Sequence, residues 1–326
     1  MRERILAMLK ESKDFVSGQE LCEKFSVSRT AVWKAINALK EAGYEVEAVR
    51  NKGYRLVASP DVLLSDEIKS LLETKWFGRK ILYFDSIDST NNEIKRQAEK
   101  ELVPGMLAIA EEQTAGRGRR ERKWVSPPGT GIWMSFPVKP DLPPYKASMI
   151  TLVTALAVAR AVEDETGLDA GIKWPNDIVV NGRKITGILT EMSAEMTSIH
   201  YVVIGIGINA NTEEFPEEIK ETASSLFIES GKKVKRSRIV ATFGKYFEKY
   251  YDMFCEAGNL STIKPEYEER LVNKDKEVYI IDKDEKIRRT AVGIGDEGEL
   301  IVKDDNGNEE KIIAGEVSVR GIYGYV

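Results

Sequence analysis

Residues 116–124 read GRGRRERKW, and this stretch decides how the rest of the chain is interpreted. Five cationic side chains and two glycines fall within residues 116–123, in a chain of 326 residues whose net charge is −5. Glycine lets a backbone approach a ligand closely, and guanidinium groups pair with phosphate through two parallel hydrogen bonds. Trp124 supplies a ring that can stack on a base. The stretch predicts a loop for a nucleotide or an acyl phosphate, with non-specific nucleic-acid binding as the alternative.

This loop differs from a P-loop, because no Gly-Lys-Ser or Gly-Lys-Thr follows its glycines. Its positive charges repel one another, so we expect the loop to be disordered without a ligand.

The surrounding residues, 63–268, alternate predicted strands with longer predicted helices. The strands are 81–87, 106–112, 131–138, 171–180, 185–192 and 200–210, and the helices are 91–100, 147–167 and 238–258. This alternation is typical of a mixed α/β domain.

Two polar segments lie where predicted strands end. Residues 88–91, DSTN, stand between a strand and a helix, where hydroxyls and free backbone N–H groups can reach a ligand. Taken alone, the segment is better explained as an ordinary helix cap. Asn209 closes GIGIN at 205–209, and its amide could meet the planar edge of adenine. A lone Gly-x-Gly is weak evidence for a nucleotide.

A further polar segment, KWPND at 173–177, precedes NGRKITG at 181–187. Asn181-Gly182 is typical of a two-residue hairpin turn. Lys184 then begins a strand and points inward, where it could neutralise a carboxylate or a transferring phosphoryl group. A solvated lysine at a hairpin tip is the alternative, and the spacing does not separate the two.

Residues 1–60 predict a winged helix-turn-helix. Ser17 and Ser28 are placed to cap two short helices joined by a tight turn, and a hairpin about residues 51–53 forms the wing. These 60 residues carry 11 Lys and Arg against 8 Asp and Glu, and this net charge of +3 favours an anionic partner.

The DNA contacts are expected on one face of the second helix and on the wing. The helix-turn-helix spans Gly18 to Asn37, and the candidate contacts are Arg29, Thr30, Trp33, Lys34, Asn37 and Lys52. A charge of +3 predicts weak binding by one copy, so two copies would be needed. A packing module with a solvated charged face is the alternative.

Residues 271–326 alternate polar and apolar side chains, with turns at 282–285, 296–298 and 305–307. This pattern predicts a small β-barrel of roughly five short strands. A lid that makes no ligand contact is the alternative.

The composition indicates a globular protein in a reducing compartment. Hydrophobic residues make up 42% of the chain and charged residues 31%. We expect no apolar run to reach the length needed to cross a bilayer, and the charged N-terminus does not resemble a signal peptide. Cys22 and Cys255 lie far apart without metal-like spacing, so we expect a cytoplasmic protein with no membrane contact.

Five motifs that follow a winged helix resemble the bifunctional biotin–protein ligases that also repress biotin operons. They are DSTN at 88–91, QTAGRGRRERKW at 113–124, KWPND at 173–177, RKITGIL at 183–189 and GIGIN at 205–209. The resemblance spans essentially the whole chain. It implies an α+β multidomain fold, with a winged helix-turn-helix at 1–60, a mixed α/β ligase domain similar to class II synthetases at 63–268, and an SH3-like β-barrel at 271–326.

The resemblance further implies that biotin and Mg-ATP form biotinyl-5′-AMP, from which biotin passes to a lysine of a carboxylase carrier domain. Biotin would contact Ser89, Thr90, Asn91, Gln113, Gly116, Arg117, Gly118, Arg119, Lys184 and Gly187. ATP and the adenylate would contact Arg119, Arg122, Trp124, Asn176, Lys184 and Asn209. Lys184 and Arg119 would carry catalysis, and Mg²⁺, brought by ATP, would lie near Asp177.

The same resemblance implies that the adenylate acts as a corepressor, because it promotes a homodimer that binds operator DNA. The chain departs from the family at Glu121, where glycine is common, and residues 212–226 show no obvious aromatic to complete an adenine pocket. The alternatives are a lipoate-type ligase, a biotin-sensing repressor without catalysis, and a ligase whose winged helix no longer regulates transcription.

Overall fold

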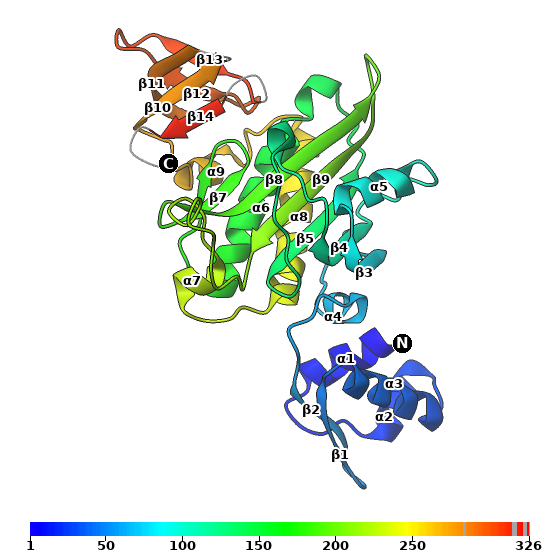
Figure 1. Ribbon diagram of the computed structural model, residues 1–326. Helices are drawn as coiled ribbons and strands as arrows, with labels where there is room; N and C mark the ends of the chain where they lie inside the picture. The colour runs from blue at the N-terminus through cyan, green and yellow to red at the C-terminus, as the bar shows by residue number, and fades with distance from the viewer. Residues whose placement is uncertain (283–284, 315–317, 322–324, 326) are drawn as a thin grey trace.

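The computed structural model describes residues 1–326 apart from 283–284, 315–317, 322–324 and 326. Figure 1 shows three groups of elements that follow chain order, with the N-terminal group at one end and the C-terminal sheet at the other. The central group is the largest and carries the main sheet.

The N-terminal group is the winged helix-turn-helix that the sequence predicts. Its elements are α1 Arg2–Glu11, α2 Gly18–Phe25, α3 Arg29–Glu41, β1 Glu45–Val49 and β2 Gly53–Ala58. Ser17 and Ser28 cap α2 and α3, since their side chains accept hydrogen bonds from the backbone N–H groups of Glu20 and Ala31. Leu6, Leu21 and Ile36 are among the side chains that form a separate core beneath the three helices.

A short helix, α4 Ser65–Lys69, joins this group to the centre. Its Glu67 is buried and accepts hydrogen bonds from Lys10 Nζ at 2.6 Å, Tyr44 Oη at 2.5 Å and Ser237 Oγ at 3.3 Å. One carboxylate therefore holds together α1, the segment between α3 and β1, and α8 Arg236–Ala257. Burial and this carboxylate raise the pKa of Tyr44.

Residues 59–61, between the winged helix and α4, are also held. Arg236 is buried, and its Nε and backbone N–H donate to the Asp61 carboxylate at 2.8 and 2.9 Å. Its Nη1 donates to Glu111 at 2.7 Å. The winged helix is therefore joined to the start of α8 and to a strand of the main sheet by a network of charge-assisted hydrogen bonds.

The central sheet has seven strands among the described residues, in the order β3-β4-β5-β9-β8-β7-β6. Only the β3–β4 pair in this sheet, as described, is parallel. The strands are β3 Ile81–Ile87, β4 Leu107–Gln113, β5 Gly131–Val138, β6 Gly171–Lys173, β7 Asp177–Val180, β8 Arg183–Ala194 and β9 Ile199–Asn209. The helices around them are α5 Thr90–Ala98, α6 Met149–Thr166, α7 Leu226–Ser230, α8, and α9 Lys264–Glu269.

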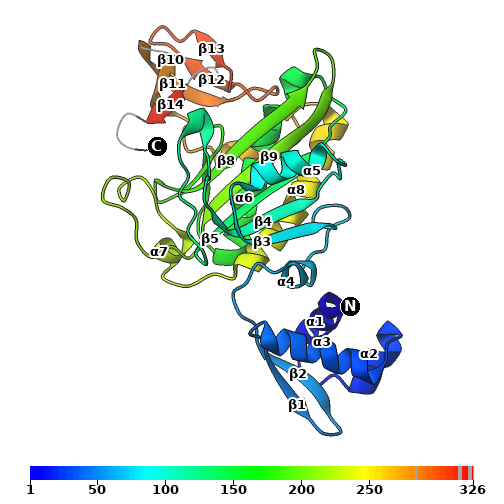
Figure 2. The same cartoon turned by 45° about the vertical axis from the view of Figure 1, so that its right-hand side comes forward.

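Side-chain alternation assigns the two faces of this sheet. Leu107 and Ile109 of β4 join the large core with α6 and α8, whereas Ala108 packs with Ile94 of α5. Figure 2 shows α5 on one side of the sheet, and α6 and α8 on the other. The α5 face leaves part of β8 and β9 uncovered, and the site forms there.

Two expectations about this region were wrong. Residues 171–180 form two antiparallel strands, β6 and β7, because the chain turns at a cis Trp174–Pro175 bond. The second expectation was that no apolar run is long enough to cross a bilayer. By length and composition, the stretch Pro144–Thr166 is long and apolar enough to do so. In the structure 78% of its apolar window is buried, and α6 lies within the main core.

The C-terminal group is a five-stranded antiparallel sheet within the described residues, in the order β13-β12-β11-β10-β14. Its strands are β10 Lys276–Asp282, β11 Glu285–Ile294, β12 Leu300–Lys303, β13 Glu309–Ile312 and β14 Ser318–Gly321. The described pairings leave β13 and β14 as separate edges, so a closed barrel is not confirmed. Part of the turn predicted at 282–285 lies outside the described residues.

Candidate active site between the central sheet and the C-terminal sheet

Small residues on β8 and β9 form the floor of the site. Gly187 pairs with Gly207, and Leu189 pairs with Gly205, so these positions share the face turned toward α5. A Cβ on Gly207 would lie 2.6 Å from Trp124 Nε1, and one on Gly205 would lie 2.1 Å from Asn91 Oδ1. The two glycines of GIGIN therefore make room for two different side chains of the site.

A buried hydrogen-bond network occupies the α5 end of this floor. Thr90 donates to Gln113 Oε1 through its backbone N–H at 2.9 Å and its hydroxyl at 3.0 Å. Asn91 Nδ2 donates to Glu191 at 2.7 Å, and its Oδ1 accepts from Ser135 Oγ at 2.5 Å. Such a network presents donors and acceptors in fixed directions, which suits a planar polar group such as a cyclic urea.

Ser89 precedes this network as the N-cap residue of α5. Its side chain is buried and makes no capping hydrogen bond among the residues that the structure describes. An ordinary helix cap therefore does not explain the serine, and its hydroxyl is placed beside the cavity.

The cationic loop folds over the site as a small hairpin. Arg117 and Lys123 form a β-bridge, and Gly118 N–H donates to Arg122 C=O at 2.7 Å. The tip is left-handed, since Arg120 and Glu121 both have φ 56°. This conformation costs about 1–2 kcal/mol for an L-residue, so glycine at Glu121 would adopt it more easily.

The loop is attached to both sides of the site. Arg117 Nη2 donates to Asn92 at 2.7 Å, and Arg119 Nη1 donates to Asn176 Oδ1 at 2.9 Å. Burial lowers the pKa of Arg119, and the nearby Asp177 partly opposes this shift. An arginine stays charged even so, and it supplies a positive charge with little competing water.

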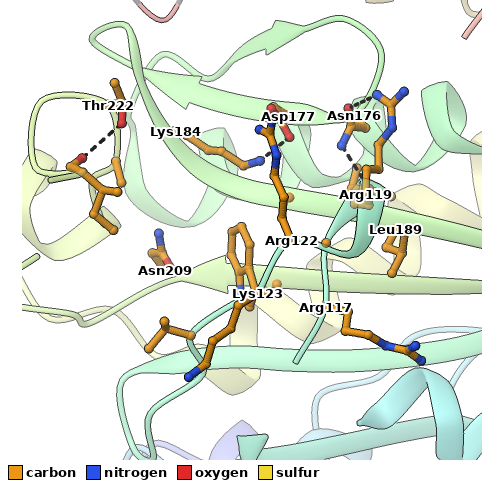
Figure 3. A pocket seen from close by; sticks show the side chains of 18 of the residues that line it. Arg117, Arg119, Arg122, Lys123, Asn176, Asp177, Lys184, Leu189, Asn209 and Thr222 are labelled. Carbon is orange, nitrogen blue, oxygen red and sulfur yellow. Dashed lines mark hydrogen bonds and ion pairs between the residues drawn. The ribbon is translucent and has the colours of Figure 1, made fainter. Parts of the chain in front are cut away.

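The charged end of the site lies at the start of β7 and β8. Lys184 Nζ lies 2.6 Å from Asp177 Oδ1 and 5.3 Å from the centre of the Trp124 ring. Figure 3 shows Lys184 and Asp177 facing each other, with Asn176 and Arg119 alongside. The Asn181-Gly182 turn was predicted correctly, because both residues have positive φ and link β7 to β8. Lys184 points into the cavity and not into solvent at a hairpin tip.

The segment after β9 closes the site at the end where Asn209 lies. Lys184 N–H donates to Thr222 C=O at 2.8 Å, and Ser224 N–H donates to Lys184 C=O at 2.9 Å, so this segment lies along the start of β8. Asn209 Nδ2 donates to Ser224 C=O at 3.1 Å. Phe215 also lines the cavity, so this segment brings one aromatic residue to the site.

These parts enclose one continuous cavity of about 1170 Å³. It is lined by Ser89, Thr90, Asn91, Gln113, Arg117, Gly118, Arg119, Arg122, Trp124, Asn176, Asp177, Lys184, Gly187 and Asn209. Gly116 is absent from the lining described. It lies at the base of the loop, where its carbonyl accepts from Trp124 N–H at 2.9 Å.

Charge favours an anionic occupant. Eight Lys and Arg residues among the described lining face four Asp and Glu residues. A concave surface lined by an excess of one sign of charge attracts the opposite sign, so the cavity is suited to a phosphorylated ligand.

Sequence reasoning missed Ser126, Ser135 and Glu191. Ser135 was detectable, because it interrupts the apolar run of β5, whose residues are all buried. Glu191 and Ser126 gave no such indication, since their partners Asn91 and Gln113 are distant in sequence.

Magnesium fits this site as a companion of phosphate. Within the described part of the chain, no cluster of three or more His, Cys, Asp or Glu residues could hold a metal ion alone. Mg²⁺ commonly binds through one or two carboxylates together with substrate phosphates, and Asp177 is placed to provide such a carboxylate.

The candidate DNA contacts lie on the surface of the winged helix. Arg29, Thr30, Trp33, Lys34 and Lys52 are exposed, and Asn37 is partly exposed. Trp33 is 56% exposed although it is a large aromatic in the middle of α3. An exposed aromatic flanked by cations is typical of a binding face.

Three family models match successive parts of the chain. They are an HTH domain at residues 2–55, the Biotin/lipoate A/B protein ligase family at residues 83–209, and the Biotin protein ligase C terminal domain at residues 275–320.

Several known proteins are similar to this chain over most of its length. The "Bifunctional ligase/repressor BirA" of Bacillus spizizenii is 41% identical over 90% of this chain and 91% of its own length. The Escherichia coli protein of that name is 30% identical over 97% and 96%. The biotin protein ligase of Aquifex aeolicus, solved in complex with biotin and ATP, is 30% identical with a TM-score of 0.65 and covers 74% of this chain and 99% of its own.

Proposed function

Because this chain belongs to the family of bifunctional biotin–protein ligases and repressors, we propose that it attaches biotin to a carboxylase carrier domain and regulates transcription through the same intermediate. The observation that carries this proposal is the single cavity that joins the Thr90–Asn91–Gln113 network to Lys184 and Trp124. It offers a polar end for the biotin ring, a charged middle for the reacting groups and an aromatic end for adenine.

In the first step a biotin carboxylate oxygen attacks the α-phosphorus of ATP. The new O–P bond forms as the bond to the bridging oxygen breaks, and pyrophosphate leaves with its electrons. Two anions must approach each other, so fixed cations are the main source of catalysis. We assign that role to Lys184 and Arg119, and Mg²⁺ carried by ATP would neutralise further phosphate charge near Asp177.

In the second step the carrier lysine amine attacks the acyl carbon of biotinyl-5′-AMP. A C–N bond forms, the C–O bond to AMP breaks, and the amine proton is released. The adenylate is a reactive mixed anhydride, so the hairpin of residues 116–123 serves to retain it and to exclude water. Its anchors on Asn92 and Asn176 lie on opposite sides of the cavity, which supports this role.

The DNA-binding role follows from the winged helix and its attachment. One copy carries a charge of only +3, so we propose that the adenylate promotes a homodimer whose two winged helices read a two-fold operator. The anchoring of the winged helix through Glu67 and Arg236 supports this role, because half-site spacing requires a fixed orientation.

The C-terminal sheet is proposed to act as an SH3-like barrel that helps bind ATP and the carrier domain. Tyr279, Ile281 and Lys286 from this sheet line the cavity, which supports a role in ligand binding. We place the whole protein in the cytoplasm, where its carboxylase partner and operator DNA would be found.

The test incubates the full chain with biotin, Mg-ATP and a carboxylase carrier domain, with lipoate as the competing acid. We expect biotin on the carrier, biotin-dependent pyrophosphate release, and loss of both in Lys184→Gln. Release that depends on lipoate alone would contradict the assignment. Sedimentation with and without biotin plus ATP tests the dimer, and an unchanged monomer at micromolar protein would exclude it.

A further inference from the structure

Tyr325 lies against the active site and lines its cavity. The hydroxyl donates to Asp177 Oδ2 at 2.5 Å, across 148 positions of sequence. Lys173 Nζ lies 3.5 Å from the centre of the Tyr325 ring. Lys173 is only 7% exposed, and a cation is attracted to an aromatic face more strongly when water is excluded.

These two contacts involve both ends of one turn. Lys173 ends β6 and Asp177 begins β7, so Tyr325 touches the chain on either side of Trp174, Pro175 and Asn176. The C-terminal sheet holds the same turn at a second place, since Trp174 Nε1 donates to Gly298 C=O at 3.1 Å.

The contacts continue to the proposed catalytic lysine. Asp177 Oδ2 accepts from Tyr325, while Asp177 Oδ1 lies 2.6 Å from Lys184 Nζ. The tyrosine therefore fixes one oxygen of the carboxylate whose other oxygen holds the lysine. Without the hydroxyl the Asp177 carboxylate could rotate, and Lys184 would lose a defined position.

We propose that Tyr325 is a positioning residue for adenylate formation, acting through Asp177 on Lys184. This inference rests on the proposed ligase function. It gives Tyr325 a specific task, because the ligase centre is fully assembled only while its ring and hydroxyl hold Lys173 and Asp177.

The experiment compares Tyr325→Phe and Tyr325→Ala in the full chain, with Tyr145→Phe as a matched control. Tyr145 is 73% exposed and lies outside the described cavity lining. We expect Tyr325→Phe to lower kcat for biotin-dependent ATP–pyrophosphate exchange by about 10- to 100-fold, the range for one hydrogen bond to a charged group. The KM for biotin should change less than about twofold, because biotin binds at the other end of the cavity. Tyr325→Ala should lose more, since it also removes the ring beneath Lys173.

A double-mutant cycle with Asp177→Asn separates positioning from general destabilisation. If Tyr325 acts through Asp177, adding Tyr325→Phe to Asp177→Asn should cost little further activity. Full additivity would overturn the inference, as would exchange by Tyr325→Phe within twofold of the unsubstituted protein. A melting temperature equal to that of Tyr145→Phe would show that Tyr325→Phe is folded. If Tyr325→Ala does not fold, the activity of Tyr325→Phe alone tests the inference. Absence of biotin-dependent exchange in the unsubstituted protein would instead overturn the proposed function.

Discussion

Substituting alanine for Gly207 tests whether the floor of the cavity selects what lies above it. The added Cβ would stand 2.6 Å from Trp124 Nε1 and 2.7 Å from its Cε2. Ordinary contacts to Cβ exceed about 3.4 Å, so the indole would have to move by close to 1 Å. Gly207 lies on a regular strand, and its backbone suits alanine, so the substitution changes space and not backbone conformation.

Forcing one extra methyl group into a packed site costs about 1–3 kcal/mol. If Trp124 stacks on adenine, this cost should appear as an affinity for ATP about 5- to 150-fold weaker. The affinity for biotin should change much less. Gly205→Ala should show the reverse preference, because its Cβ would stand 2.1 Å from Asn91 Oδ1, in the network proposed for the biotin ring.

Calorimetric titration of each variant with biotin and with a non-hydrolysable ATP analogue measures both affinities. Gly18→Ala is the control, because its Cβ would meet only Tyr54 Cε2, at an ordinary 3.7 Å, in the winged helix. If Gly207→Ala and Gly205→Ala each lose equal affinity for biotin and for the ATP analogue, the floor does not have a biotin end and an adenine end. Unchanged binding in both variants would refute the placement of Trp124 and Asn91.

Three further predictions concern the remainder of the chain. Glu67→Gln should weaken operator binding by about 10-fold or more, because it breaks the buried charge pair with Lys10 where the winged helix is attached. Ligase activity should stay within threefold. Fluorescence anisotropy measures binding to operator DNA, and the carrier assay measures ligase activity. Arg96 lowers the pKa of Asp88 by hydrogen bonding, so the pair stabilises the fold at neutral pH and loses this effect as the pH falls below the unfolded value of about 4. Because both side chains are more than one-third exposed, Asp88→Asn should cost less than about 1 kcal/mol in chemical denaturation at pH 7 and still less in acid; a larger cost in acid would contradict the sign. Trp33→Ala should weaken operator binding by about 10-fold without lowering the melting temperature, since the ring is 56% exposed; unchanged affinity would remove Trp33 from the DNA contacts.

Much of the fold could be predicted because the local rules agreed with one another. The Ser17 and Ser28 caps, the Asn181-Gly182 turn and the period-two strands each depend on residues a few positions apart, and each is present in the structure. The failures occurred where distant residues decide the outcome. Residues 171–180 are an exception, because Pro175 is a local signal that interrupts a strand, and the structure has two short strands on either side of it.

The candidate site could be predicted only as a set of motifs. The sequence showed which hydroxyl, amide and cationic side chains the motifs contain. The resemblance to a family then assigned them to one site. Their contacts across the sheet were not predictable, because Asn91 meets Glu191 through the β8–β9 register and the packing of α5. Phe215 lay in a segment with no periodic pattern, so only the cavity lining revealed it.

The sequence by itself determined the chemistry of this protein: a cationic glycine-containing loop, a strand-borne lysine and a basic winged helix. Tertiary structure alone decided which oxygen of Asp177 meets Lys184 and which meets Tyr325, and which glycine lies beneath Trp124. The physical reason is range. Caps, turns and side-chain periods are set by neighbours in the chain, whereas a hydrogen bond across 148 positions depends on how separate elements pack.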